Sequence, residues 1–107
     1  MADRYTTPTL QLSIEGVDLT GCTVIVTLRQ GRKVLNVRDF DSLSIDAANG
    51  SAEIDITLSQ QQTAMFREGA PVEVQANYLD PNGFRGDTSI ETVTFGRNIH
   101  EAVMRNG

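Results

Sequence analysis

The chain has 107 residues and a mass of 11.7 kDa, which is the size of one domain with one hydrophobic core. Its 9 Lys and Arg stand against 14 Asp and Glu, a net charge of -5 that argues against nucleic acid or an anionic membrane as the main partner. A single cysteine excludes an internal disulfide and a cysteine-based metal cluster. One histidine and no tryptophan leave few groups for catalysis, so we expect no enzymatic activity and no cofactor or metal.

Neither a membrane span nor a secretory signal is expected. Apolar runs reach only three residues, as in Val24-Ile25-Val26, whereas a span needs roughly 18. The start at Met1 to Arg4 is polar and lacks the apolar core of a signal peptide. Synthesis in a reducing cytoplasm fits this start and the lone Cys22.

Alternating apolar and polar residues predict three strands in the first part of the chain, over 9–15, 22–28 and 34–37. In the first strand, Leu10, Leu12 and Ile14 share the inward face. In the second strand, Ile25 breaks the polar phase, so we expect partial cover on both faces. The segment 30–33 is expected to be the turn between the second and third strands.

A hairpin is predicted next. Leu43 and Ile45 alternate with polar residues, and a turn over 47–50 ends in an Asn-Gly pair that tolerates positive φ. The return strand over 52–58 turns four apolar residues inward: Ala52, Ile54, Ile56 and Leu58.

A short helix is predicted near 59–67. Ser59 and Gln62 have the spacing of a capping box, in which each side chain binds the other residue's backbone N–H. Gly69 and Pro71 end the helix within about three turns. Its apolar anchors are Ala64, Met65 and Phe66.

Further strands are expected over 72–78, from Phe84 onward and over 90–95. A tight turn at 80–83 joins the first two of these. The segment 98–104 fits either a capped helical turn or another strand.

About seven short strands with regular turn signals predict an all-β fold, an immunoglobulin-like antiparallel β-sandwich with one short inserted helix near 59–67. Residues 1–107 form one domain, and the ends 1–6 and 105–107 are expected to be mobile. The Cys and Trp pattern of true immunoglobulin domains is absent, so this prediction concerns architecture alone.

Charge is unevenly distributed along the chain. Residues 39–91 carry ten acids and two bases, a sum of -8, whereas 1–38 sum to +2 and 92–107 to +1. An acidic flank and a mildly basic flank would suit head-to-tail contact between copies. Ordinary solvated strand faces are the alternative explanation.

No residue is predicted to be catalytic, cofactor-binding or metal-binding. His100 has no recognisable triad partners, and Cys22 lies in the apolar phase of a strand, so we interpret these two as a surface side chain and a core side chain. The carboxylate pairs are too few for calcium and have no evident cleft for glycoside hydrolysis; they are Asp39 with Asp41 and Glu53 with Asp55.

Two short motifs are interpreted as structural. Asp80-Pro81-Asn82-Gly83 lacks the spacing of a calcium loop and its closing Glu. Arg85-Gly86-Asp87 spells the tripeptide read by integrin-type receptors, but a glycine here has a sufficient role as a bulge or bend in a strand.

The order of segments resembles a type of small bacteriophage and prophage protein, and the N-terminal domain of phage baseplate upper proteins. The resemblance spans about Thr7 to Asn98. It is carried by Thr7 to Leu12, Asp18 to Gly21, Val24 to Gly31, Leu58 to Phe66 with Gly69, and Val72 to Asn77. The Leu58 block is similar to a Leu-Thr-Gln-Glu-Glu-Thr stretch that ends in Phe and Gly; the residues here keep the cap and lack its acids.

This resemblance implies a non-enzymatic structural component of the tail or baseplate, located in the virion and made in the bacterial host cytoplasm. It would be repeated around a symmetry axis and bind other virion proteins, with a homo-oligomer possible in principle. We expect residues 1–9 and 96–107 to contact adjacent subunits, since sheet edges and chain ends suit such pairing.

A carbohydrate-binding β-sandwich module is the alternative, and Tyr5 and Phe40 are its candidate binding residues. Such modules usually present a flat row of aromatic side chains, and this chain has only two Tyr and four Phe. A hydrolase is a third reading with little support from the residues.

Overall fold

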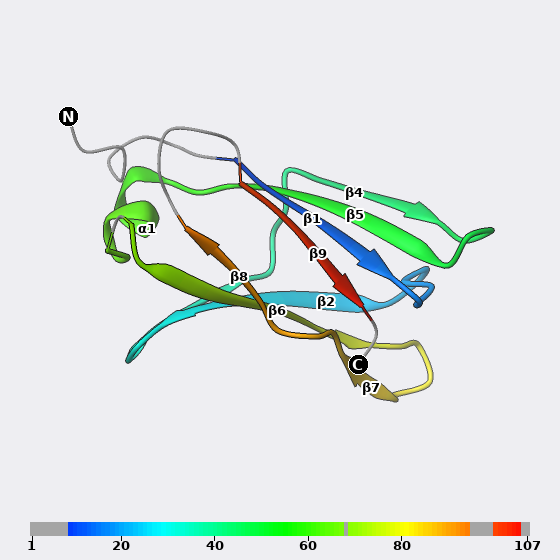
Figure 1. The fold of residues 1–107 in the computed structure, drawn as a ribbon. Coiled ribbons are helices and arrows are strands. Elements are labelled where there is room, and N and C mark those ends of the chain that lie inside the picture. Colours follow the sequence, from blue (N-terminus) through cyan, green and yellow to red (C-terminus); the bar gives the residue numbers. More distant parts are fainter. Residues whose placement is uncertain (1–8, 68, 95–99, 106–107) are drawn as a thin grey trace.

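The computed structural model describes residues 9–67, 69–94 and 100–105, in which two β-sheets pack face to face beside one short helix (Figure 1). The nine strands of this part are β1 (Thr9–Glu15), β2 (Thr23–Gln30), β3 (Lys33–Val37), β4 (Ser42–Asp46), β5 (Ser51–Thr57), β6 (Pro71–Leu79), β7 (Arg85–Asp87), β8 (Glu91–Thr94) and β9 (His100–Arg105). The helix α1 (Gln60–Ala64) follows β5 at one end of the molecule. The molecule measures 45 × 25 × 19 Å along its principal axes.

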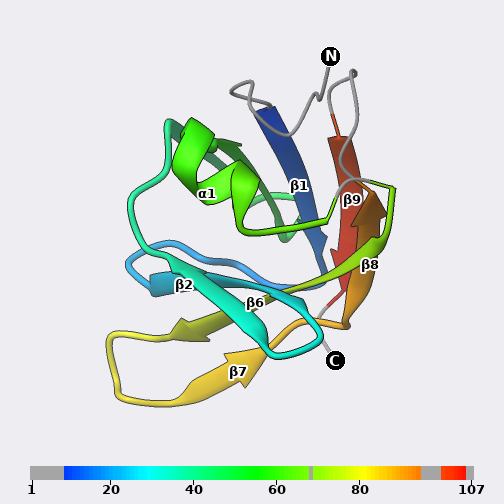
Figure 2. The same cartoon turned by 90° about the vertical axis from the view of Figure 1, so that its left-hand side faces the viewer.

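The predicted sandwich-like arrangement is therefore present at the level of two packed sheets. The four-stranded sheet has the order β4-β5-β1-β9, and the five-stranded sheet has the order β3-β2-β6-β7 with β8 also on β6. Figure 2 views the two layers from one end, with the helix α1 beside them.

Both predicted hairpins are confirmed. β4 pairs with β5 through the turn that ends at Gly50, whose φ of 64° is the positive value expected there. β6 pairs with β7 beyond the turn at Asp80. The sequence pattern located these hairpins because their turn residues and strand alternation agree.

The prediction of an antiparallel sandwich is wrong for one pair of strands. β9 lies parallel to β1, with Leu12 opposite Ala102 and Ile14 opposite Met104. The chain leaves β8 in the five-stranded sheet and enters β9 in the four-stranded sheet at the end where β1 also begins (Figure 1). Alternation reports which side chains face inward, but it carries no information about the direction of the partner strand.

The structure also differs from the prediction in the number of strands, and it settles the form of residues 100–104. The described residues contain nine strands instead of about seven, and 100–105 form a strand, which decides the choice left open for 98–104. Arg105 ends β9. The expected mobile residues 1–6 and 106–107 lie outside the described residues.

The core lies between the sheets. It includes the residues predicted to face inward from the strands over 9–15 and 52–58 and the predicted helix anchor Phe66. Further members come from β2, β6 and β8, together with Leu19, Val37 and Met104. Leu10, Ile54 and Val74 are completely inaccessible to solvent. Burying a side chain of this size contributes about 1.5–3 kcal/mol relative to leaving it exposed, so this shared interior is the main source of stability.

The helix is shorter than predicted, but its cap is confirmed. Gln62 N donates to Ser59 Oγ at 3.1 Å, and Ser59 N donates to Gln62 Oε1 at 2.9 Å. Of the expected apolar anchors, Phe66 is buried, Met65 is half-buried and Ala64 is exposed. One turn beyond the cap is enough to place Phe66 over the core.

Gln30 of β2 holds the segment that follows the helix. Its Nε2 donates to the carbonyl oxygens of Arg67 at 3.1 Å and Ala70 at 3.3 Å, and its Oε1 accepts from Arg67 N. The sequence pattern placed Gln30 in a turn, because a side-chain bond between residues 37 apart leaves no local signal.

No helix in the described ranges is long and apolar enough to cross a membrane.

Candidate functional site

Cys22 lies half-buried at the edge of the core, just before β2. Its Sγ donates to Asp18 O at 3.9 Å. Burial, together with the charges of Asp80 and Asp18, raises the pKa of the Cys22 thiol above its ordinary value. A thiol held in its protonated form is a poor nucleophile, which agrees with its interpretation as a packing residue.

The two carboxylate pairs lie on β5 and in the segment before β4. Glu53 and Asp55 lie on the outer face of β5, as their spacing predicted, and Ser42 Oγ donates to Asp55 Oδ2 at 3.0 Å. Asp39 and Asp41 lie in the exposed crossover between β3 and β4. In the described ranges, no group of three or more His, Cys, Asp or Glu is placed to hold a metal ion.

The segment at Asp80 is a side-chain-stabilised turn. Asp80 Oδ1 accepts from the backbone N–H groups of Asn82 and Phe84, both at 2.9 Å, and Gly83 N donates to Asp80 O at 3.0 Å. Gly83 has a φ of 90°, which a residue with a side chain rarely adopts. The Asp80 carboxylate is therefore occupied by hydrogen bonds within the turn.

The Arg85-Gly86-Asp87 motif coincides with β7 and is paired to β6. A Cβ on Gly86 would lie within 2.3 Å of the Tyr78 ring, so the glycine is required by the ring that lies over it. The sequence suggested a bulge or bend at Gly86; the structure gives a cross-strand reason instead.

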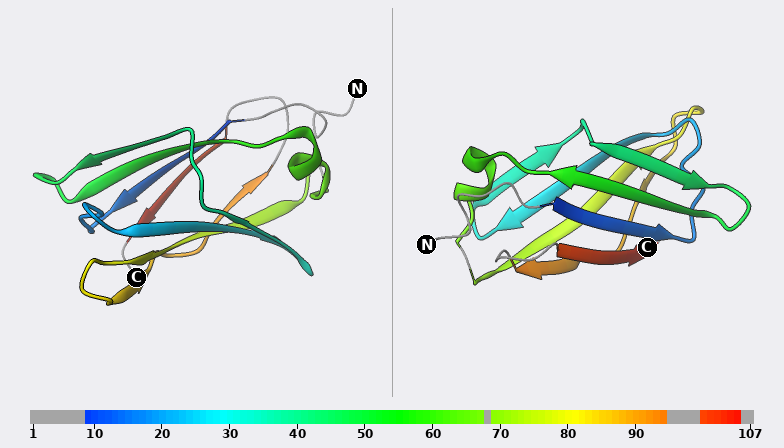
Figure 3. Two further views of the ribbon diagram at one scale, coloured as in Figure 1. Left: turned by 180° about the vertical axis from the view of Figure 1, so that it is seen from behind. Right: turned by 90° about the horizontal axis from the view of Figure 1, so that it is seen from above.

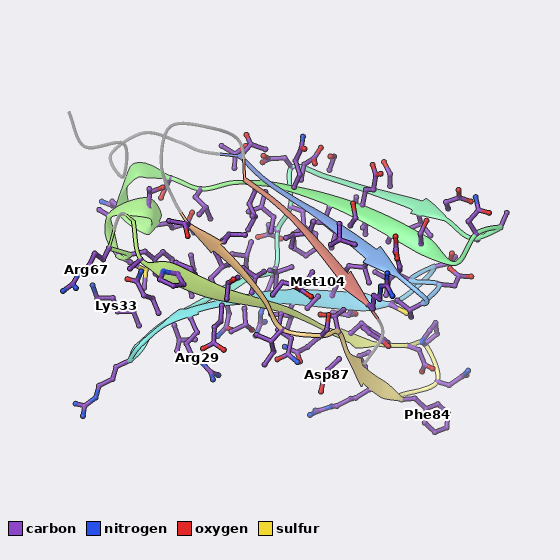
Figure 4. All side chains as sticks on the ribbon, viewed as in Figure 1. Arg29, Lys33, Arg67, Phe84, Asp87 and Met104 are labelled. Carbon is purple, nitrogen blue, oxygen red and sulfur yellow. The ribbon has the colours of Figure 1, made fainter. Side chains whose placement is uncertain are left out.

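A shallow hollow of about 290 Å³ lies beside this hairpin, in the five-stranded sheet. Polar, charged and apolar residues line this hollow: Thr23, Ile25, Asn77, Tyr78, Leu79, Arg85, Gly86 and Asp87. Phe84, the residue before Arg85, is 72% exposed at the tip of the hairpin (Figure 4). The sequence predicts only that a strand begins at Phe84, and no pattern marks this side chain as exposed.

Two consecutive hairpins of the chain carry opposite charges. The basic hairpin, residues 29–38, contains Arg29, Arg32, Lys33 and Arg38 and no acid. The acidic hairpin, residues 39–58, contains Asp39, Asp41, Asp46, Glu53 and Asp55 and no base. The tips of the two hairpins lie toward opposite ends of the molecule and in different layers (Figures 1 and 4). All nine of these charges are exposed or half-buried.

Both charged hairpins also expose apolar side chains. Val34 of β3 is 45% exposed, and Leu43 and Ile45 of β4 are 39% and 36% exposed. Leu43 and Ile45 are paired with Ile54 and Ala52, so they belong to the inner face of their sheet at a place that the other sheet does not cover. A second hollow, of about 270 Å³, is lined by Ser44, Ile45, Asp46, Ser51, Ala52 and Glu53.

The structure describes some of the remaining candidate residues and not others. His100 begins β9, and Phe40 is half-buried against the core. Tyr5 lies outside the described residues, as do residues 1–8 and 96–99 of the expected subunit contacts. Residues 100–105 of that expected contact instead pair with β1 within the chain.

No family model, curated protein or solved structure matches the chain in the comparisons with known proteins. The likeness to phage proteins thus rests on the residues quoted for it.

Proposed function

We propose that the protein is a non-enzymatic structural component of a bacteriophage or prophage particle, in the tail or baseplate region, and that it acts by protein–protein assembly. The immunoglobulin-like architecture expected from the strand spacing is part of this proposal, supported by the two packed sheets. Its partners are other virion proteins and further copies of the chain.

The observation that carries assembly is the pair of oppositely charged hairpins on a small sandwich. Each hairpin includes a strand that ends its sheet among the described residues, and each exposes apolar side chains. Each therefore combines charge, a strand edge and apolar surface, three features used in recognition between proteins. Because the two surfaces differ, contact between copies would be head-to-tail and could close into a ring.

The phage assignment is supported by the resemblance. The block from Leu58 to Phe66 keeps the capped helix that the family pattern implies, and it ends on a buried Phe66 and a Gly69 with a φ of 81°. These are structural features of a fold, so the assignment needs a test that does not depend on the fold.

Sequencing the DNA that flanks the gene provides this test. We expect neighbouring genes for tail, baseplate or capsid proteins, and an antibody to the chain should label purified particles from the same source. If the gene for this chain lies among genes for metabolic enzymes, and purified particles lack the chain, the phage assignment is contradicted.

A carbohydrate-binding module remains the second candidate, because the exposed Phe84 adjoins a hollow lined by Asn77, Arg85 and Asp87. An aromatic face beside polar groups is a common way to bind a sugar ring. A glycan array decides between the two: saturable binding that is lost in Phe84→Ala, and retained in Leu43→Ala, a control at an exposed apolar residue of the other sheet, would favour this candidate.

A further inference from the structure

Among the described residues, β4 and β9 lie at the edges of one sheet, and β3, β7 and β8 lie at the edges of the other. Two of these edges, β3 and β4, belong to the charged hairpins. In the described part of the chain, β3 ends the five-stranded sheet and β4 ends the four-stranded sheet. Alternate backbone N–H and C=O groups of an edge strand point away from its neighbour and can pair with another chain. β4 contains no proline or lysine, the residues that commonly block such an edge.

Charge decides which edges can meet. Pairing β4 with β4 of another copy would bring two acidic hairpins together, and pairing β3 with β3 would bring together two basic hairpins. Like charges at short range disfavour both arrangements. Of the three pairings between these two edges, only that of β3 with β4 joins unlike charges.

An antiparallel register follows from the side chains. With Lys33 of β3 opposite Asp46 of β4, the next pair along the strands is Val34 opposite Ile45. Residues directly opposite share a face, so this register forms an ion pair on one face and an apolar pair on the other. It also covers Val34 and Ile45, which are among the most exposed large apolar residues of the two hairpins.

We propose that β3 of one copy adds to β4 of the next copy in this antiparallel register, through the basic hairpin of the first and the acidic hairpin of the second. Ile45 and Asp46, the two β4 residues of this register, also line the 270 Å³ hollow. The contact uses two different surfaces, so it repeats from copy to copy and gives a ring or an open row. It rests on the proposed function in that both invoke assembly.

Sedimentation velocity of the full chain tests this contact. The unmodified protein associates as its concentration rises, while Lys33→Glu and Asp46→Lys each weaken association on the order of tenfold by placing like charges opposite each other. The equimolar mixture of the two variants, and the double variant Lys33→Glu/Asp46→Lys, regain association because opposite charges face each other again. Arg85→Glu, which makes the same charge change outside both hairpins, is the matched control and keeps association.

Hydrogen exchange on the unmodified protein gives a second reading that does not require a variant to fold. Amides of β3 and β4 gain protection together with concentration, whereas self-pairing of β4 would protect β4 alone. A chain that stays monomeric to about 1 mM, the weak end of measured affinities, overturns the contact, and so does full association of Lys33→Glu. Flanking virion genes beside a monomeric chain would remove this contact only, and association without such genes would remove the phage assignment only.

Discussion

Thr88 is a buried polar residue that joins strands from both sheets. Its Oγ1 accepts from Ala76 N at 3.0 Å and lies 3.3 Å from the Met104 Sδ of β9. Its own N–H donates to Ala76 O at 2.9 Å, so Thr88 pairs with β6 between β7 and β8. The hydroxyl thus satisfies a backbone group at the point where the strand partner of β6 changes.

Replacing Thr88 by Val keeps the shape and leaves Ala76 N without its acceptor in the interior. We expect a loss of about 1–3 kcal/mol in the free energy of unfolding, the usual cost of a buried unsatisfied donor. Urea denaturation measures this loss. Thr88→Ser retains the hydroxyl and serves as the control, and equal stability of the two variants would contradict the role given to the hydroxyl.

Alternation could not reveal Thr88, because it lies between two predicted strands and is polar. Gly86 is similar: its position was visible in the sequence, but its reason, the Tyr78 ring, comes from another strand. At the residue scale, the sequence predicted inward-facing apolar positions well and long-range polar partners poorly.

β9 is the element for which the structure adds most. The sequence pattern over 98–104 fits a capped helical turn or a strand, and periodicity does not decide between them. Met104 is completely buried and points between the layers, whereas Val103 is 51% exposed (Figure 4). The strand therefore contributes to the core of its own chain.

We expect Met104→Ala to lower the free energy of unfolding by about 2–5 kcal/mol, because it opens a cavity between the sheets. The neighbouring substitution Val103→Ala is the matched control and should change stability by about 0.5 kcal/mol or less. Thermal unfolding of the two variants checks this difference. Similar midpoints would show that β9 is not integrated into the sandwich.

At the scale of the whole molecule, charge separation is the dominant feature. The crossover from β3 to β4 carries the chain from one layer to the other and divides a purely basic hairpin from a purely acidic one (Figure 3). The imbalance along the chain is visible in the sequence, and in the part of the chain that the structure describes the two hairpins lie at edges of different sheets.

Association between copies should weaken as salt rises, because exposed unlike charges are screened once the Debye length falls to a few Å. We expect the apparent dissociation constant to rise severalfold between about 0.02 M and about 0.5 M NaCl, a range over which the Debye length shortens from roughly 20 Å to roughly 4 Å. Light scattering at fixed protein concentration follows this change. Association that strengthens with salt would instead indicate apolar contact between surfaces of like charge.

The sequence by itself determined the strands before β9, the capped helix and most of the core, because alternation, turn residues and the Ser59 cap are local signals. Only the tertiary structure decided that β9 runs parallel to β1, that Gln30 binds the segment after α1, and that β3 and β4 are edges. These features depend on which distant segments become neighbours. That choice depends on the packing of the whole chain, and no short stretch of residues encodes it.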